Sequence, residues 1–348
     1  MNRRRFLTAA ATAAAATAVT ATTTGTSVAA SAPFAASAPC AGAAPRVGTS
    51  DVLVLRDGLD ALTALDDFRG GHTGLEGAAL AGAARALEKQ RLGATQRIRL
   101  RLFSVAAEYT ATAAWSALDA GRSDRAHALL GKALYLAGMG QDPVTELRVW
   151  NSYAMLARQR GEYGEALDSG LAAQATGITK RDPVFASLAH ARTAVGYAYL
   201  GERQAALRSL GYAREAMVKA GAGPRVRWMA FYGPAELAAI TAVVLDRIGD
   251  HAGAEAASHR ALAAIPEQFR RNRALATTRL ALAQLHQRDV DQACATASRV
   301  FALMSGSPIP GRMRSLLGEF RRAVIILAPD ASAGREWADR YRSEGSRA

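Results

Sequence analysis

Residues 112–138 read TAAWSALDAGRSDRAHALLGKALYLAG, and this stretch decides the fold. Gly121 offers a tight turn near its middle. Ala114 lies seven residues before that glycine, and Ala126 and Ala133 lie five and twelve residues after it. Small side chains at these places let two helices joined by a short turn approach each other closely. The stretch therefore predicts a helical hairpin.

The same spacing recurs four more times along the chain. The turn residues of the five copies fall about forty residues apart and are Gly121, Gly161, Gly201, Gly249 and Arg288. The small residues of the later copies are Ala154, Ala166 and Ala173; Ala194, Ala206 and Ala213; Ala242, Ala254 and Ala261; and Ala281, Ala293 and Val300. A single hairpin cannot bury its apolar stripe, so the copies must stack on one another. We therefore expect an all-α chain, a TPR-like α-solenoid of about five hairpins whose repeat exceeds the roughly 34 residues of a tetratricopeptide.

Further helices are expected at both ends of the repeats. Residues 72–119 should supply one or two opening helices, because apolar residues recur there at helical spacing. The stretch from Pro310 to Tyr341 should form a closing helix pair that is interrupted near Pro329. The predicted helical repeat domain thus covers residues 51–348.

Residues 1–50 differ in composition from the rest, since they contain no Asp or Glu and are rich in Ala, Thr, Ser and Pro. An arginine pair followed by Phe-Leu resembles the start of a twin-arginine export signal, at Arg3, Arg4, Phe6 and Leu7. Small residues near positions 29 and 38 offer cleavage sites. The composition equally suits a disordered linker. The two interpretations differ in the intact mass of the native protein, because export would remove the leader.

The chain carries a net charge of +13. Its arginines are scattered along helical segments and form no dense block, so we do not expect direct DNA binding by this chain alone. No segment approaches the roughly eighteen apolar residues that a membrane span requires. The sequence therefore predicts no membrane span.

The sequence shows no catalytic or metal-binding constellation. Cys40 and Cys294 are the only cysteines and cannot form a disulfide framework or a zinc cluster. The histidines are spread singly, and the two nearest, His251 and His259, lie too far apart for joint ligation on one helix face. Phosphate loops, nucleophile elbows and zinc-protease motifs are absent. We predict a non-enzymatic protein with no catalytic residue, no metal and no cofactor.

The first helix of each pair should line the inner face of the superhelix, which can take a peptide or another helix. Six residues before each turn the side chain is always apolar, at Trp115, Met155, Val195, Val243 and Leu282. In the second repeat Arg148, Asn151 and Arg158 could hold a carboxylate beside this apolar line. Two roles stay open for the line. It lines a groove for an amphipathic helix or a small apolar ligand, or it is core packing, the commoner role of such stripes.

Four blocks of sequence carry a resemblance to a known family. They are LRDGLDALTALDDFRGG at residues 55–71, the block around Ala114-Trp115 with Asp119-Ala120-Gly121, WMAFYGPAELAAITAVVLDRIGD at 228–250, and LALAQLHQRDVDQACATASRVFALM at 280–304. In order and spacing they resemble the tetratricopeptide-type C-terminal region of actinobacterial helix-turn-helix transcriptional regulators of the XRE type. In that family a DNA-binding domain precedes the repeats, and an Arg-Phe-Leu segment often joins the two. That domain is missing here, so the resemblance makes the leader a linker relic.

The resemblance implies a cytoplasmic regulatory or scaffold protein that binds a protein or peptide partner through its repeat groove. A signalling peptide and a small apolar ligand are alternative occupants, and a homodimer is left open. The alternative function follows from the leader. It is a binding protein exported by the twin-arginine route.

Overall fold

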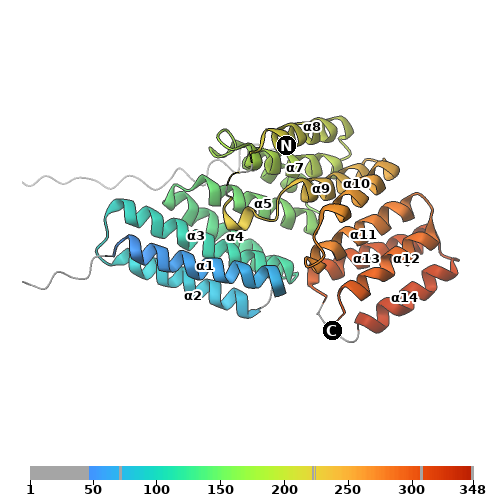
Figure 1. The fold of residues 1–348 in the computed structure, drawn as a ribbon, viewed down its shortest axis with the longest axis horizontal. Coiled ribbons are helices and arrows are strands. Elements are labelled where there is room, and N and C mark those ends of the chain that lie inside the picture. The colour runs from blue at the N-terminus through green and yellow to red at the C-terminus, as the bar shows by residue number, and fades with distance from the viewer. Residues whose placement is uncertain (1–46, 70–72, 222, 224, 306–308, 346–348) are drawn as a thin grey trace, which may run out of the picture. The chain divides into compact units, whose positions relative to one another are not determined.

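The structure of the protein, a computed structural model, describes residues 47–69, 73–221, 223, 225–305 and 309–345. These residues form helices joined by short connections and contain no β-strand (Figure 1). The prediction of an all-α chain is confirmed. The export motif at Arg3, Arg4, Phe6 and Leu7 lies outside the described residues, as do the cleavage sites and Cys40.

The helices follow one another in the order α1 Thr49–Arg69, α2 Thr73–Arg91, α3 Gln96–Asp119, α4 Ser123–Gly140, α5 Pro143–Arg160, α6 Tyr163–Ala175, α7 Pro183–Tyr199, α8 Arg203–Lys219, the 3-10 helix η1 Arg227–Met229, α9 Pro234–Arg247, α10 His251–Ala264, α11 Arg270–His286, α12 Val290–Leu303, α13 Gly311–Leu327 and α14 Ser332–Gly345. Each of the five predicted turns joins two helices that pack against each other, from α3 with α4 to α11 with α12. The predicted closing pair is α13 and α14, and it is interrupted at residues 328–331.

All five predicted turn residues have left-handed backbone conformations. The φ angles are +79° at Gly121, +77° at Gly161, +79° at Gly201 and +85° at Gly249. Glycine adopts this region without strain because it has no Cβ. Arg288 takes the same conformation with φ +70°, although it carries a side chain. The repeated turn is therefore a property of the backbone, which the fifth copy keeps without glycine.

The small residues predicted at close approaches between helices are buried in every copy. They are Ala114, Ala126 and Ala133; Ala154, Ala166 and Ala173; Ala194, Ala206 and Ala213; Ala242, Ala254 and Ala261; and Ala281, Ala293 and Val300. Larger side chains there would push the paired helices apart, because packed interiors have little spare volume.

The first helices of successive pairs also contact one another. α3 contacts α5, α5 contacts α7, and the series continues through α9 and α11 to α13. α13 in turn contacts α3, where the Cβ that Gly311 lacks would lie 2.5 Å from the carbonyl oxygen of Ala120. We call the surface on which these six helices meet the first-helix surface. Because its last member contacts its first, it turns toward the interior of the helical unit.

One helix was not predicted. α1 packs against α2 and α3, so the packed region begins at Thr49 and not in the early seventies. Asp66 and Asp67, expected to cap or form a turn, lie inside this helix. The buried Tyr109 of α3 holds α1 by donating a hydrogen bond to the carbonyl oxygen of Leu55 at 2.7 Å.

The apolar core is divided along the chain into three clusters. The first joins α1 to α5, the second lies between α5 and α9, and the third joins α11 to α14. Cys294 belongs to the third cluster, as expected of a small buried residue, and burial raises the pKa of its thiol to about 11. In the part of the chain that the structure describes, no helix has both the length and the apolar character needed to cross a bilayer.

Candidate functional site

The predicted apolar line is distributed over all three core clusters. Met155 belongs to the first cluster, Val195 to the second and Leu282 to the third, and all three are buried. Trp115 and Val243 are only partly buried. These two side chains therefore remain the accessible members of the line.

A polar line runs beside the apolar one. Two residues before each turn the chain places a side chain with a polar group, at Asp119, Gln159, Tyr199, Arg247 and His286. Residues four apart lie on the same face of a helix, so this line borders the apolar line six residues before the turn. The sequence analysis considered only the apolar position. The same repeat register, read four residues further on, would have shown the polar one.

The three polar residues predicted in the second repeat all contact neighbouring first helices. Arg148 donates to Thr112 Oγ1 at 2.9 Å and to the carbonyl oxygen of Glu108 at 3.3 Å. Asn151 Oδ1 accepts a hydrogen bond from Arg192 Nε at 2.7 Å. Each of these contacts joins α5 to the first helix before it or after it.

Arg158 is the predicted residue that enters a larger group. Its guanidinium lies 3.5 Å from the hydroxyl of Tyr199 and 5.8 Å from the centre of that ring. Arg247 lies 4.6 Å from the same ring centre, and the ring of Tyr163 lies 4.8 Å away. With Arg279 of α11, these residues form what we call the arginine–tyrosine cluster: Arg158, Tyr163, Tyr199, Arg247 and Arg279.

The electrostatics of Tyr199 reveal the sign of the potential in this cluster. Burial acts to raise the pKa of Tyr199, but the positive charges of Arg279 and Arg158 outweigh it and hold the pKa below its ordinary value. A phenolate is stabilised only where positive potential exceeds the cost of desolvation. The cluster therefore favours negative charge on an adjacent group.

Carboxylates balance the arginines elsewhere on the first-helix surface. Asp119 pairs with Arg271 at 2.8 Å and with Arg312 at 3.1 Å, and the guanidinium of Arg312 also lies 5.2 Å from the ring centre of Trp115. Glu236 lies 3.9 Å from Arg192, and Glu319 lies 3.6 Å from Arg279.

Glu236 is hemmed in by protein yet keeps contact with open space. Burial raises its pKa, and the charges of Arg192 and Arg312 only partly offset this effect. Even so, 28% of its side-chain surface is accessible. The first-helix surface therefore borders space that a small group can enter.

Two buried donors on this surface lack hydrogen-bond partners among the described residues. They are Nε2 of Gln159, beside Arg158 in sequence, and Nε1 of Trp228, whose ring centre lies 5.7 Å from Arg148. Buried donors are usually paired, and an unpaired one costs about 1–3 kcal/mol. Both could therefore donate to an acceptor on a bound ligand.

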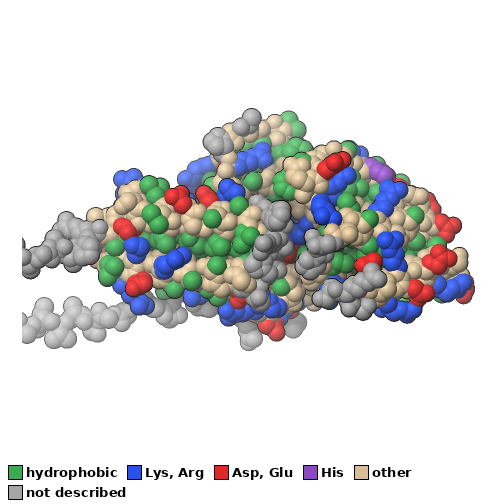
Figure 2. Space-filling model, turned by 60° about the horizontal axis from the view of Figure 1, so that its bottom comes forward, with side chains coloured by type: hydrophobic (Ala, Val, Ile, Leu, Met, Phe, Trp, Pro, Cys, Tyr) green, Lys and Arg blue, Asp and Glu red, His purple; other side chains and the backbone are tan. Residues whose placement is uncertain are grey.

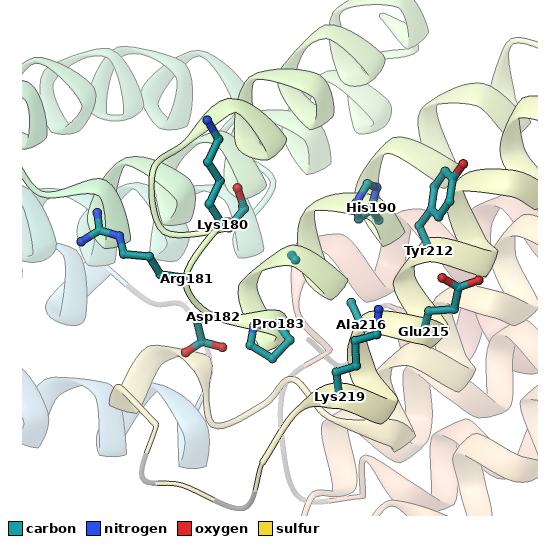
Figure 3. A pocket seen from close by; sticks show the side chains of 11 residues that line it. Lys180, Arg181, Asp182, Pro183, His190, Tyr212, Glu215, Ala216 and Lys219 are labelled. Carbon is teal, nitrogen blue, oxygen red and sulfur yellow. The ribbon is translucent and has the colours of Figure 1, made fainter.

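A separate hollow of about 310 Å³ lies between α7, α8 and the residues before α7. Figure 3 shows His190 and Tyr212 side by side at its edge, with their ring centres 5.4 Å apart. It contains none of the residues predicted from the sequence. On the face shown in Figure 2, lysine and arginine side chains are dispersed among acidic ones, in line with the scattered arginines of the sequence.

No protein-family model and no curated protein sequence matches this chain. The kinship with XRE-type regulators thus rests on the four quoted sequence blocks.

Proposed function

We propose that this chain is a non-enzymatic regulatory or scaffold protein that binds a peptide or protein segment through a TPR-like superhelix. The repeated left-handed turns and buried alanines support the superhelix, because they are the features a stack of helical hairpins requires. The sequence blocks support kinship with regulators of the XRE type. We place the protein in the cytoplasm on the same kinship.

The arginine–tyrosine cluster is the observation that carries the proposal. Arg158, Arg247 and Arg279 gather around Tyr199, and Glu319 is the one carboxylate with a described ion pair to any of them. Such a surplus of guanidinium groups binds carboxylates through charge-assisted hydrogen bonds. The proposed ligand is therefore an acidic peptide, either through Asp and Glu side chains or through its terminal carboxylate.

The first-helix surface also supplies apolar contact for such a peptide. Trp115 and Val243 are partly exposed members of the apolar line. A bound segment with one acidic and one apolar side would match the two parallel lines. An amphipathic peptide thus remains the proposed partner, with acidic groups as its anchor.

The test is the affinity of the full chain for fluorescently labelled amphipathic peptides, measured by anisotropy. One set carries Glu at the polar positions and a free C-terminus, and its counterpart carries Lys and a C-terminal amide. We expect the acidic set to bind more tightly. Arg158→Gln should weaken that binding by about tenfold or more, because a hydrogen bond to a charged group contributes roughly 1.5–3 kcal/mol.

Arg208→Gln is the matched control, because Arg208 is exposed on the second helix α8. It removes the same charge from the outer side of a hairpin and should leave the affinity unchanged. Equal losses in the two variants would reduce the effect to net charge. Equal affinity of the wild type for acidic and basic peptides would contradict the proposal.

A further inference from the structure

Three residues from three successive helices converge near the fourth turn. Asp246 lies near the end of α9, His251 begins α10, and His286 ends α11. Nδ1 of His251 lies 2.9 Å from Oδ1 of Asp246, and Nδ1 of His286 lies 2.7 Å from the same oxygen. One ligand atom from each residue lies within 4.8 Å of the others. We propose that these residues form a binding site for a divalent transition-metal ion, with Zn²⁺ as the representative ion.

The donor set fits this class of ion. Imidazole nitrogen and carboxylate oxygen are ligands that Zn²⁺, Co²⁺, Ni²⁺ and Cu²⁺ accept, whereas Mg²⁺ and Ca²⁺ prefer oxygen alone. Two histidines and one carboxylate occupy three positions of a tetrahedron and leave the fourth to water. Zinc–ligand bonds of about 2.0–2.2 Å place neighbouring ligand atoms roughly 3.3 Å apart. The present separations need to widen by only a few tenths of an ångström.

Without metal, Asp246 can accept a hydrogen bond from each imidazole. A carboxylate oxygen has two lone pairs, so both rings can share one acceptor when each carries its proton on Nδ1. Moving those protons to Nε2 turns both Nδ1 lone pairs toward the same point. The two rings lie 5.0 Å apart between centres, which suits ligands of one ion.

The surroundings leave this site accessible and the neighbouring acids occupied. The exposed fractions of the side chains are 32% for His251, 28% for His286 and 16% for Asp246, so one side is open to solvent. Asp250 is engaged as the N-cap of α10 by accepting from the backbone N–H of Gly253 at 3.0 Å. Glu255 accepts from Gln284 at 2.9 Å and from Gln287 at 2.7 Å. These two acids are thus held by other partners, whereas the three proposed ligands face one another.

A metal ion at this place would join two hairpins. Asp246 and His251 flank the turn between α9 and α10, whereas His286 belongs to the following pair. Coordination by all three would fix α11 against the preceding hairpin. The expected consequence is a rise in thermal stability on metal binding, because a ligand that binds only the folded state stabilises it.

The experiment is calorimetric titration of the untagged full chain with ZnCl₂ after removal of metal by EDTA and dialysis. We expect one high-affinity Zn²⁺ per chain and a raised Tm. His286→Gln and His251→Gln should each lower the affinity by at least about tenfold, the loss that even outer partners of metal ligands cause. With CoCl₂, the wild type should show the visible bands of tetrahedral Co²⁺, and these bands should vanish in either variant.

His259→Gln is the matched control, because His259 lies on the same helix as His251 with 60% of its side chain exposed. It should retain the wild-type affinity and Co²⁺ spectrum. Absence of Zn²⁺ binding by the wild type would overturn the proposal. So would undiminished binding by both ligand variants with circular dichroism unchanged.

Discussion

At the scale of single residues, glycines allow close contacts that the repeat pattern does not specify. Gly82 of α2 accommodates the ring of Tyr109, which a Cβ at that position would overlap. Gly196 of α7 faces α6, and a Cβ there would lie 2.7 Å from Cα of Leu167. The first contact locks the opening helices together, and the second lets two neighbouring hairpins meet.

Gly196→Ala should therefore destabilise the protein by about 1–3 kcal/mol, since the added methyl group meets backbone that cannot rotate away. The measurement is the free energy of unfolding in urea. Gly211→Ala in α8 is the control, because a Cβ added there would meet no neighbouring helix or side chain within 4 Å. It should stabilise the protein by up to about 1 kcal/mol through helix propensity. Destabilisation of both variants to the same degree would contradict this account.

At the scale of elements, α1 shows how a helix without the repeat signature is held in place. Asp51 Oδ1 accepts a hydrogen bond from Lys89 of α2 at 2.6 Å, and Oδ2 accepts from the backbone N–H of Gly48 at 2.9 Å. The hydrogen bond from Lys89, followed by that from Gly48, lowers the pKa of Asp51 below its ordinary value of 3.8. A depressed carboxylate pKa favours the folded state only while the group is charged.

This contribution should be present above pH 3.8, the ordinary pKa of Asp51, and disappear as the pH falls through its lower value in the folded protein. Asp51→Asn should cost at most about 1 kcal/mol at pH 6, since the ion pair is partly exposed. The difference between wild type and variant should shrink as the pH falls below 4. Urea unfolding at several pH values measures it, with Asp57→Asn, an exposed carboxylate of α1, as control. A pH-independent difference would contradict the prediction.

At the scale of the whole helical unit, the contact of α13 with α3 joins segments far apart in the chain. Asp119 is buried and pairs with Arg271, which follows 152 residues later, and with Arg312. Removing the carboxylate leaves two poorly exposed guanidinium groups without it, and breaking such a pair costs about 3–5 kcal/mol. The closure therefore depends strongly on one side chain.

Asp119→Ala should lower the free energy of unfolding by about 3–5 kcal/mol. It should also increase amide hydrogen exchange at the start of α13 more than within α8, because the lost contact lies at α13. Asp124→Ala removes an exposed carboxylate that pairs with Arg160, and it should cost less than about 1 kcal/mol. Uniform exchange changes across all helices in Asp119→Ala would speak against a local closing contact.

The amino-acid sequence by itself determined the helical content, the five turns and the buried small residues. These features follow from local rules, because helix periodicity, glycine at positive φ and small side chains at contacts all repeat at fixed spacing. It also located the apolar line and Arg158, though not the role of either. α1 escaped prediction because its contacts with α2 and α3, such as that from Tyr109, are not periodic.

Only the tertiary structure brought the candidate sites together. Tyr199, Arg247 and Arg279 reach Arg158 from different helices, and Asp246 meets His286 across 40 residues of sequence. The search for ligands among neighbouring histidines compared His251 with His259 and so missed His286. Sequence spacing determines which residues share a helix face, whereas the approach of one helix to the next determines which faces meet. That approach is set by packing over the whole stack, which no single stretch of sequence contains.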